Sequence, residues 1–238
     1  MEETVRFVPK NASHLEARFL SEDGQRKYEE AVKQFRNERA REVLRIPREG
    51  SNLFKVLLLN QIGIRTATLP ELDQIVQGNE GFLRGFYTDA PSVVLRSNGD
   101  SYEPNHYLAK CFARLIRKRK FREPVVINGL KLVEDNDSAY GLGFNRGKNF
   151  DFFEAPELSH ENNGRKFITI DGRGMPVFDE KGTRTLYTRP DGLSGFCLSG
   201  GSDVDSGSGS LAVSYDSGRV VVVSAEGTLQ KIKQGAQR

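Results

Sequence analysis

The chain has 238 residues, of which 37% are hydrophobic, and its 35 basic and 32 acidic residues give a net charge of +3. This composition can bury a sizeable core, and the near balance of charge excludes a strongly basic or acidic protein. No apolar stretch approaches the roughly 18–20 residues of a membrane-spanning helix. Residues 1–6 lack the basic start and apolar run of a secretory signal. We therefore expect a soluble protein without membrane insertion, located in the cytoplasm or in a compartment that the sequence leaves unknown.

Helical periodicity dominates the first half of the chain. Apolar residues spaced three and four apart predict helices over residues 22–44, 52–62, 68–76 and 103–120. Ser21 is expected to cap the first helix, and Thr68 followed by Pro70 is a strong start signal for the third. A short strand is expected over 92–97, closed by a turn at Asn98 and Gly99.

Strand-like runs follow from residue 123 onward. They are predicted at 125–127, 130–133, 140–144, 149–154, 166–170, 185–188 and 220–223, separated by turn signals such as Asn128-Gly129. Helices first and strands afterwards indicate the α+β class. We expect residues 1–45 to form an N-terminal helical extension, 46–225 to form the main domain, and 226–238 to form a basic C-terminal tail.

Residue types that serve catalysis do not form a recognisable pattern in this chain. Cys111 and Cys197 are far apart and match no metal or redox spacing. The three histidines are scattered, and no Gly-x-Ser-x-Gly elbow frames a nucleophile. We therefore expect no catalytic residue and no cofactor, and we predict that the protein is not an enzyme.

Two short motifs suggest calcium but have simpler interpretations. The tripeptide Glu103-Pro104-Asn105 also occurs in calcium-dependent sugar-binding lectins, yet it equally suits a helix start, and we interpret the match as coincidental. Residues 203–208 resemble a calcium loop, but the twelfth position, where an EF-hand needs a bidentate Glu, is Ser214. We therefore expect no metal site.

The densest basic cluster spans residues 114–122. Such a cluster can bind the phosphates of nucleic acid. It also closes a predicted helix, where cations meet the negative end of the helix dipole. A nucleic-acid binder acting through this helix end stays an alternative function, although the interpretation we prefer has no nucleic-acid partner.

The most informative segment runs from Asp191 to Ser224. Its first part is rich in Ser, Gly, Asp and Tyr, and it continues into the β-branched run Val220-Val221-Val222-Val223, which is typical of a buried strand. Apolar residues recur through the polar part, namely Phe196, Leu198, Val204, Leu211, Ala212 and Val213. We interpret the apolar residues as anchors and the small polar residues between them as a displayed binding surface.

This segment resembles the C-terminal variable region of the target proteins of diversity-generating retroelements, above all those of archaea and small uncultivated bacteria. The similarity rests on Asp191-Gly192-Leu193 with Phe196, on Leu211-Ala212 with Ser214, and on the run 218–223. Residues 82–90, 134–142 and 154–160 are similar to this family too, so that the resemblance covers roughly residues 46–226.

The resemblance implies a C-type lectin fold, of the kind shared with formylglycine-generating enzymes, in which Gly218-Arg219-Val220 would take the place of a closing signature. In these systems an error-prone reverse transcriptase alters template adenines. An Asn codon varied at its two adenines cannot give Lys, Glu, Gln, Met or Trp, and none of these five occurs between Ser194 and Asp216.

Mapped onto this chain, the resemblance implies a variable region at about 191–223. The implied scaffold positions are Leu193, Phe196, Leu198, Val204, Leu211, Ala212, Ser214, Gly218 and Arg219. The implied variable, ligand-binding positions are Ser194, Gly195, Cys197, Ser199, Gly200, Gly201, Ser202, Asp203, Asp205, Ser206, Gly207, Ser208, Gly209, Val213, Tyr215 and Asp216.

The resemblance thus implies a non-enzymatic protein that displays a hypervariable surface to an unknown protein or surface ligand. Most displayed residues are Ser and Gly, which supply little binding energy, so this copy is expected to bind weakly. A rival function within the same fold is a formylglycine-generating-type oxidase, which requires a pair of active-site cysteines.

Overall fold

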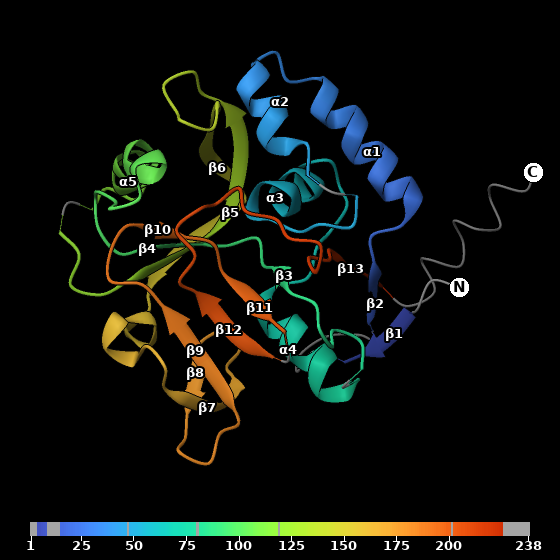
Figure 1. The fold of residues 1–238 in the computed structure, drawn as a ribbon, viewed down its shortest axis with the longest axis vertical. Helices are drawn as coiled ribbons and strands as arrows, with labels where there is room; N and C mark the ends of the chain where they lie inside the picture. The colour runs from blue at the N-terminus through green and yellow to red at the C-terminus, as the bar shows by residue number, and fades with distance from the viewer. Residues whose placement is uncertain are drawn as a thin grey trace, which may run out of the picture.

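A computed structural model describes residues 4–8, 15–46, 48–79, 81–118, 120–200 and 202–225. Helices and strands are both abundant in it, which confirms the α+β class (Figure 1). The helices in this part of the chain are α1 (Glu22–Lys33), α2 (Glu38–Leu44), α3 (Leu53–Gln61), α4 (Leu69–Gly78) and α5 (Glu103–Leu115), with 3-10 turns η1 (Pro156–Leu158) and η2 (His160–Asn162). None of these helices is long and apolar enough to cross a membrane. The predicted basic tail, 226–238, lies outside the described residues.

Local capping explains where the N-terminal helices begin. The Ser21 side chain accepts a hydrogen bond from the Gly24 amide at 3.2 Å, as predicted for the start of α1. The single helix predicted over 22–44 is wrong, because the chain leaves the helix after Lys33. Asn37 starts a second helix, since its side chain accepts from the Ala40 amide at 3.0 Å and competes with a continuous helix.

A four-stranded antiparallel sheet forms the centre of the molecule. Its order is β10 (Leu193–Ser194), β4 (Val93–Leu95), β5 (Val125–Glu134) and β6 (Leu142–Glu154). The turn predicted at Asn128-Gly129 is instead a bulge within β5. Gly129 has φ +63, and a Cβ there would meet the Asn149 carbonyl oxygen at 2.1 Å, so only glycine fits this close approach.

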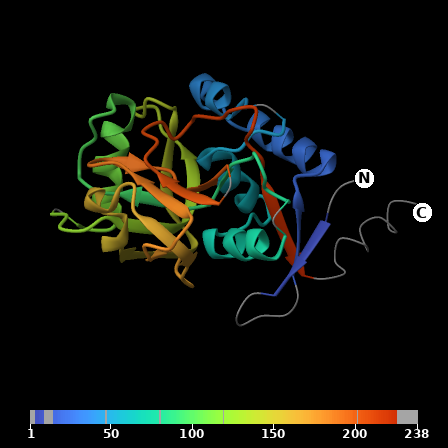
Figure 2. The ribbon, with the colours of Figure 1, turned by 60° about the horizontal axis from the view of Figure 1, so that its bottom comes forward.

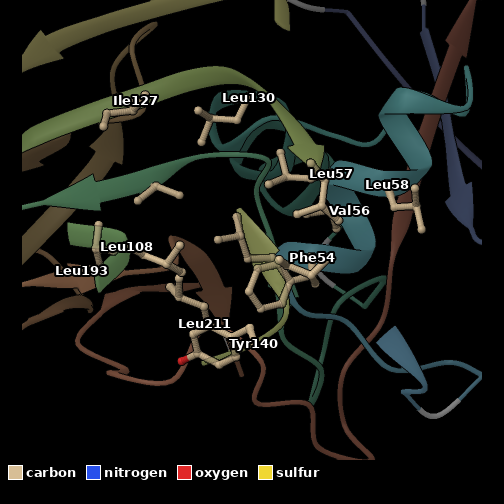
Figure 3. Packing of buried hydrophobic residues seen from close by; sticks show 14 of the residues in the cluster. Phe54, Val56, Leu57, Leu58, Leu108, Ile127, Leu130, Tyr140, Leu193 and Leu211 are labelled. Carbon is tan, nitrogen blue, oxygen red and sulfur yellow. The ribbon is translucent and has the colours of Figure 1, made fainter. Parts of the chain in front are cut away.

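Alternation along the strands divides the buried side chains between two cores. Val93 and Leu95 belong to one core, whereas Val94 between them belongs to the other. In the first core α3 and α5 pack against the sheet, and α1 and α2 add side chains from beside α3. Figure 3 shows Leu193 and Leu211 of the C-terminal segment within this core. The C-terminal segment is therefore tied into the interior of the protein.

The first 45 residues contain strands as well as helices. Strands β1 (Thr4–Phe7) and β2 (Leu15–Phe19) form an antiparallel sheet with β13 (Val221–Ala225), in the order β1-β2-β13. Figure 2 shows the blue N-terminal strands together with the red β13 at one end of the molecule, where β2 lies between β1 and β13. The helical extension predicted for 1–45 contains the helices α1 and α2, but it also contains these two strands, and the apolar strand β13 finds its hydrogen-bonding partner in β2. Tyr28 and Leu44 are buried in the first core, so this region packs as part of the fold.

A six-stranded sheet contains the β11–β12 hairpin of the polar C-terminal segment. Its order is β3 (Thr88–Asp89), β11 (Cys197–Ser199), β12 (Asp203–Ser206), β9 (Arg184–Thr188), β7 (Lys166–Ile170) and β8 (Pro176–Phe178). The β12–β9 pair is parallel and the other pairs are antiparallel. Figure 1 shows β11 and β12 beside β9, so the segment that we interpret as variable is part of a hydrogen-bonded sheet.

Candidate ligand-binding surface

The β11–β12 hairpin separates apolar from polar side chains. Leu198 and Val204 are paired across the hairpin and are only 2% and 0% exposed. On either side of them, Cys197 pairs with Asp205 and Ser199 pairs with Asp203. Because successive side chains of a strand point to opposite faces, these four residues lie on the face away from the core, and they are half-buried.

The polar face extends over four strands through one row of neighbours. Asp89 of β3 pairs with Cys197, which pairs with Asp205, which pairs with Tyr187 of β9. Paired residues on one face lie about 4.5–5.5 Å apart at Cβ, so this row is contiguous. Tyr187 is 45% exposed and ends the row with an aromatic ring. We call Asp89, Cys197, Asp205 and Tyr187 the polar row.

Burial and neighbouring charges in the polar row raise the pKa of two of its members, Asp89 and Cys197. Burial raises the pKa of Asp89 to about 7, with a smaller opposing effect from the hydrogen bond with Ser51 and a raising effect from the charge of Asp205. Burial, followed by the charges of Asp89 and Asp205, raises the pKa of the Cys197 thiol well above its usual value. The thiol is therefore neutral at physiological pH and a weak nucleophile.

Two serines from the expected variable set are not on this surface. Ser194 and Ser206 are 0% and 1% exposed, and both accept hydrogen bonds from the buried guanidinium of Arg96, at 2.9 and 2.7 Å. Thr188 accepts a third such bond at 2.6 Å. The interpretation of Ser194 and Ser206 as outward-facing is thus corrected, because both hydroxyls hold a buried cation inside the protein.

The remaining residues of the hairpin are half-buried or exposed. Gly195, Ser199 and Ser202 are half-buried and Gly200 is exposed, while Gly201 lies outside the described residues. Asp203 is half-buried as well, but its carboxylate accepts a hydrogen bond from the Thr185 amide at 2.6 Å. Its side chain therefore has a structural contact in addition to its place on the polar face.

The loop after β12 contains the most exposed residues of the segment. Gly207, Gly209 and Val213 are half-buried, whereas Ser208, Tyr215 and Asp216 are exposed, with Tyr215 at 65%. The Gly207 amide donates to the Asp205 carboxylate at 2.6 Å, and the Asn105 side chain donates to the Gly209 carbonyl. The backbone of this loop is thus held by the fold while several of its side chains face outward.

Tyr87 holds the exposed Tyr215 beside the polar row. The Tyr215 amide donates to the Tyr87 hydroxyl at 2.8 Å, and the two rings meet edge to face with centroids 6.2 Å apart. The Tyr87 hydroxyl in turn donates to the Ser51 carbonyl at 2.8 Å. A Cβ on Gly218 would lie 2.7 Å from both the Ser51 nitrogen and the Tyr87 hydroxyl, so glycine is required there.

A buried charge cluster holds the entry to the segment. Asp100 accepts from the Leu193 amide at 2.6 Å and pairs with Arg189 at 2.7 Å. Gly192 has φ +66, and a Cβ on it would lie 2.1 Å from Asp100. Arg189 also contacts Asp191 at 3.4 Å. Sequence reasoning missed the roles of Asp100 and Arg189, because no local pattern connects residues so far apart in the chain.

The calcium motifs have structural roles in this protein. The Asn105 side chain is fully buried and accepts a hydrogen bond from the Tyr140 hydroxyl at 2.7 Å, in addition to donating to two carbonyls. In the described part of the chain, no group of three or more His, Cys, Asp or Glu residues could hold a metal ion. His106 contacts the turn at Asp100, His160 begins η2, and His14 lies outside the described residues.

Both cysteines are free thiols in different surroundings. Cys111 lies on α5, where its sulfur accepts a hydrogen bond from Arg114 at 3.2 Å, whereas Cys197 lies in the polar row.

Comparisons with models of known protein families, with curated proteins and with solved structures each find no match to this chain.

Proposed function

We propose that this protein is a ligand-binding variable protein of a diversity-generating retroelement, displaying a changeable surface on a scaffold of the C-type lectin kind. The observation that carries the proposal is the separation of side chains within one hairpin. Leu198 and Val204 enter the core, and the residues paired around them, such as Cys197 and Ser199, lie on the opposite face. Codons for that face can change without altering the buried anchors.

The backbone of the displayed segment is satisfied independently of most of its side chains. Strand β11 bonds to β3 and β12, and β12 bonds to β9 on its other side. Because ladder hydrogen bonds use backbone groups, replacing an outward side chain leaves them intact. This property is what a diversified binding surface requires, since each new variant must still fold.

The chemistry of the surface favours a ligand with cationic groups. Asp205 and the exposed Asp216 carry carboxylates, and the variable segment contains no Lys. Tyr187 and Tyr215 are the large exposed aromatic rings beside them and would supply most of the contact area. The small Ser and Gly side chains between them add little, which supports weak binding by this copy.

The oxidase alternative receives no support from the cysteines. An oxidase needs a reactive thiol, but burial and two neighbouring carboxylates raise the pKa of Cys197. Cys111 contacts Arg114 on α5 instead of the polar row.

The proposal is tested by sequencing the DNA around the gene. The expected result is a second, near-identical copy of codons 194–216 close to a reverse-transcriptase gene, with differences confined to adenines of that copy. Differences are expected at codons for outward residues such as Ser199 and Tyr215, and not at those for Leu198 and Val204. The absence of any repeat, or a repeat with substitutions at all four bases, would overturn the proposal.

A further inference from the structure

Helix α5 carries a row of basic side chains on its outer face. His106, Lys110 and Arg114 are spaced four residues apart, and Arg117 follows just beyond the end of the helix. Residues at this spacing lie on one side of a helix, and all four are exposed. We call these four residues the basic row. The opposite side of α5, with Leu108 and Phe112, packs into the first core.

The basic row lines a hollow in the surface. The hollow has a volume of about 840 Å³, and its other walls are the turn at Asn98 and Gly99 and the side chain of Lys118. His106 fixes the helix against this turn, since its Nδ1 lies 3.2 Å from the Asp100 amide nitrogen. The hollow belongs to α5 and the turn before it, and none of its lining residues comes from the variable segment.

The cations of this hollow are mostly not neutralised by the protein. Lys118 pairs with Glu154. Among the described residues, no carboxylate lies within ion-pair distance of Lys110, Arg114 or Arg117. The Arg114 guanidinium contacts the Cys111 sulfur at 3.2 Å and the Lys110 carbonyl at 3.4 Å. Three positive charges therefore face one hollow without a counter-charge from the described chain.

The helix dipole accounts for only part of this arrangement. Cations stabilise the last turn of a helix, which explains Arg114 and Arg117. The effect falls off within one turn, so it does not explain Lys110 in the middle of α5 or His106 in its first half. The row continues along the helix beyond the reach of the dipole, as a site for an extended anion would.

Arg117 adopts a backbone conformation that arginine disfavours. Its φ is +56, and it lies just after the end of α5. The Arg117 amide donates to the Arg114 carbonyl at 3.0 Å, and the Lys118 amide donates to the Ala113 carbonyl at 2.9 Å. Glycine is the preferred residue at this position, because a side chain is strained there. A strained residue at the rim of a hollow is typical of a side chain retained for binding.

We propose that this hollow binds the phosphate groups of an oligophosphate chain, either a condensed phosphate or a strand of nucleic acid. Arginine presents paired N–H groups that match phosphate oxygens, and Arg114 and Arg117 supply two such groups. From Lys110 to Arg117 the row extends about 10 Å, at about 1.5 Å per residue. A row of that length can contact more than one phosphate of either chain.

The test measures binding of two probes to the full chain at 50 mM salt, sodium tripolyphosphate by calorimetry and a labelled ten-residue oligothymidylate by fluorescence anisotropy. Both are expected to bind. Tighter binding of tripolyphosphate per phosphate would identify a condensed phosphate as the ligand, and the reverse order would identify a nucleic-acid strand. Failure of both probes to bind would overturn the proposal.

Charge-matched variants separate this site from general attraction to a basic protein. The double variant Lys110→Gln/Arg114→Gln is expected to bind tripolyphosphate at least about fivefold more weakly, as the loss of two exposed ionic contacts implies. The control Lys131→Gln/Lys181→Gln removes two exposed cations from other surfaces and is expected to change the affinity less than about twofold. Equal losses in the two double variants would overturn the proposal.

Arg117→Gly gives a readout that a purely structural role would not. Relief of the strained conformation is expected to raise Tm by about 2–4 °C, and loss of the guanidinium is expected to weaken probe binding about threefold. A higher Tm with unchanged affinity would show that Arg117 has no part in binding and would contradict the proposal.

Discussion

Replacing Ser206 by alanine tests whether the polar segment divides into structural and displayed residues. The Ser206 hydroxyl is buried and accepts a hydrogen bond from Arg96 at 2.7 Å. A hydrogen bond to a charged group contributes about 1.5–3 kcal/mol, and its loss leaves a buried N–H unpaired. For a chain of this size, 1 kcal/mol shifts Tm by about 2–4 °C. We therefore expect Ser206→Ala to lower Tm by about 3–12 °C.

The matched control is Ser199→Ala, the same change on the outer face of the same hairpin. Surface substitutions stay within about 0.5 kcal/mol, so its Tm is expected within about 2 °C of the parent. Thermal unfolding followed by circular dichroism measures both variants. In an Arg96→Met background the cost of Ser206→Ala should largely vanish, because the buried donor is gone. An equal loss in Ser199→Ala, or no coupling to Arg96, would refute the reasoning.

Four further outcomes are expected. The pKa of Asp89 is raised to about 7 in the folded protein, so the fold loses stability as pH rises from about 4 to about 7. The Tm gain of Asp89→Asn should therefore be larger at pH 8 than at pH 4, and equal gains at the two pH values would contradict this. Burial lowers the pKa of Lys55 to about 8 in the folded protein, whereas an unfolded lysine has a pKa of about 10.5. Between these pH values the parent should therefore gain stability relative to Lys55→Met. A difference in unfolding free energy, measured in urea, that stayed constant over this range would count against it. Gly192→Ala places a methyl group against Asp100 and strains a left-handed residue, so its Tm should fall by more than about 4 °C; an unchanged melt would be the contrary result. Because the pKa of Cys197 is raised, iodoacetamide at pH 7.5 should modify it more slowly than a free cysteine. The modification should be faster in Asp89→Asn, which mass spectrometry of the modified peptide would measure. Equal rates in parent and variant would exclude an effect of the Asp89 carboxylate.

Local signals in the sequence predicted several elements. Ser21, Thr68 and the apolar spacing behind them located the starts of α1 and α4, and the four valines of 220–223 located β13. Four of the six apolar residues predicted to anchor the polar segment, Phe196, Leu198, Val204 and Leu211, are buried as expected, whereas Ala212 and Val213 are half-buried. These predictions succeeded because capping and alternation depend on near neighbours.

Features that depend on distant residues could not be predicted. Ser206 lies two residues after the buried Val204 in β12, so strand alternation alone already indicates that its side chain faces inward. The partner of Ser194 and Ser206 could not be predicted, because Arg96 lies far from both in the chain. Asp89 joins the polar row through strand pairing with Cys197, far along the chain. Strand β2 was missed because its charged residues hide the alternation, and its partner β13 lies at the other end of the chain.

The central claim is that outward side chains of this segment are interchangeable, whereas inward side chains are fixed. A saturation scan of residues 194–216, with the folded fraction of each variant measured after a heat challenge, tests this claim most directly. The expected result is broad tolerance at Ser199, Ser208 and Tyr215, together with rejection of polar residues at Leu198 and Val204. Tolerance that did not follow burial, with Ser199 and Tyr215 as restricted as Leu198, would contradict the account.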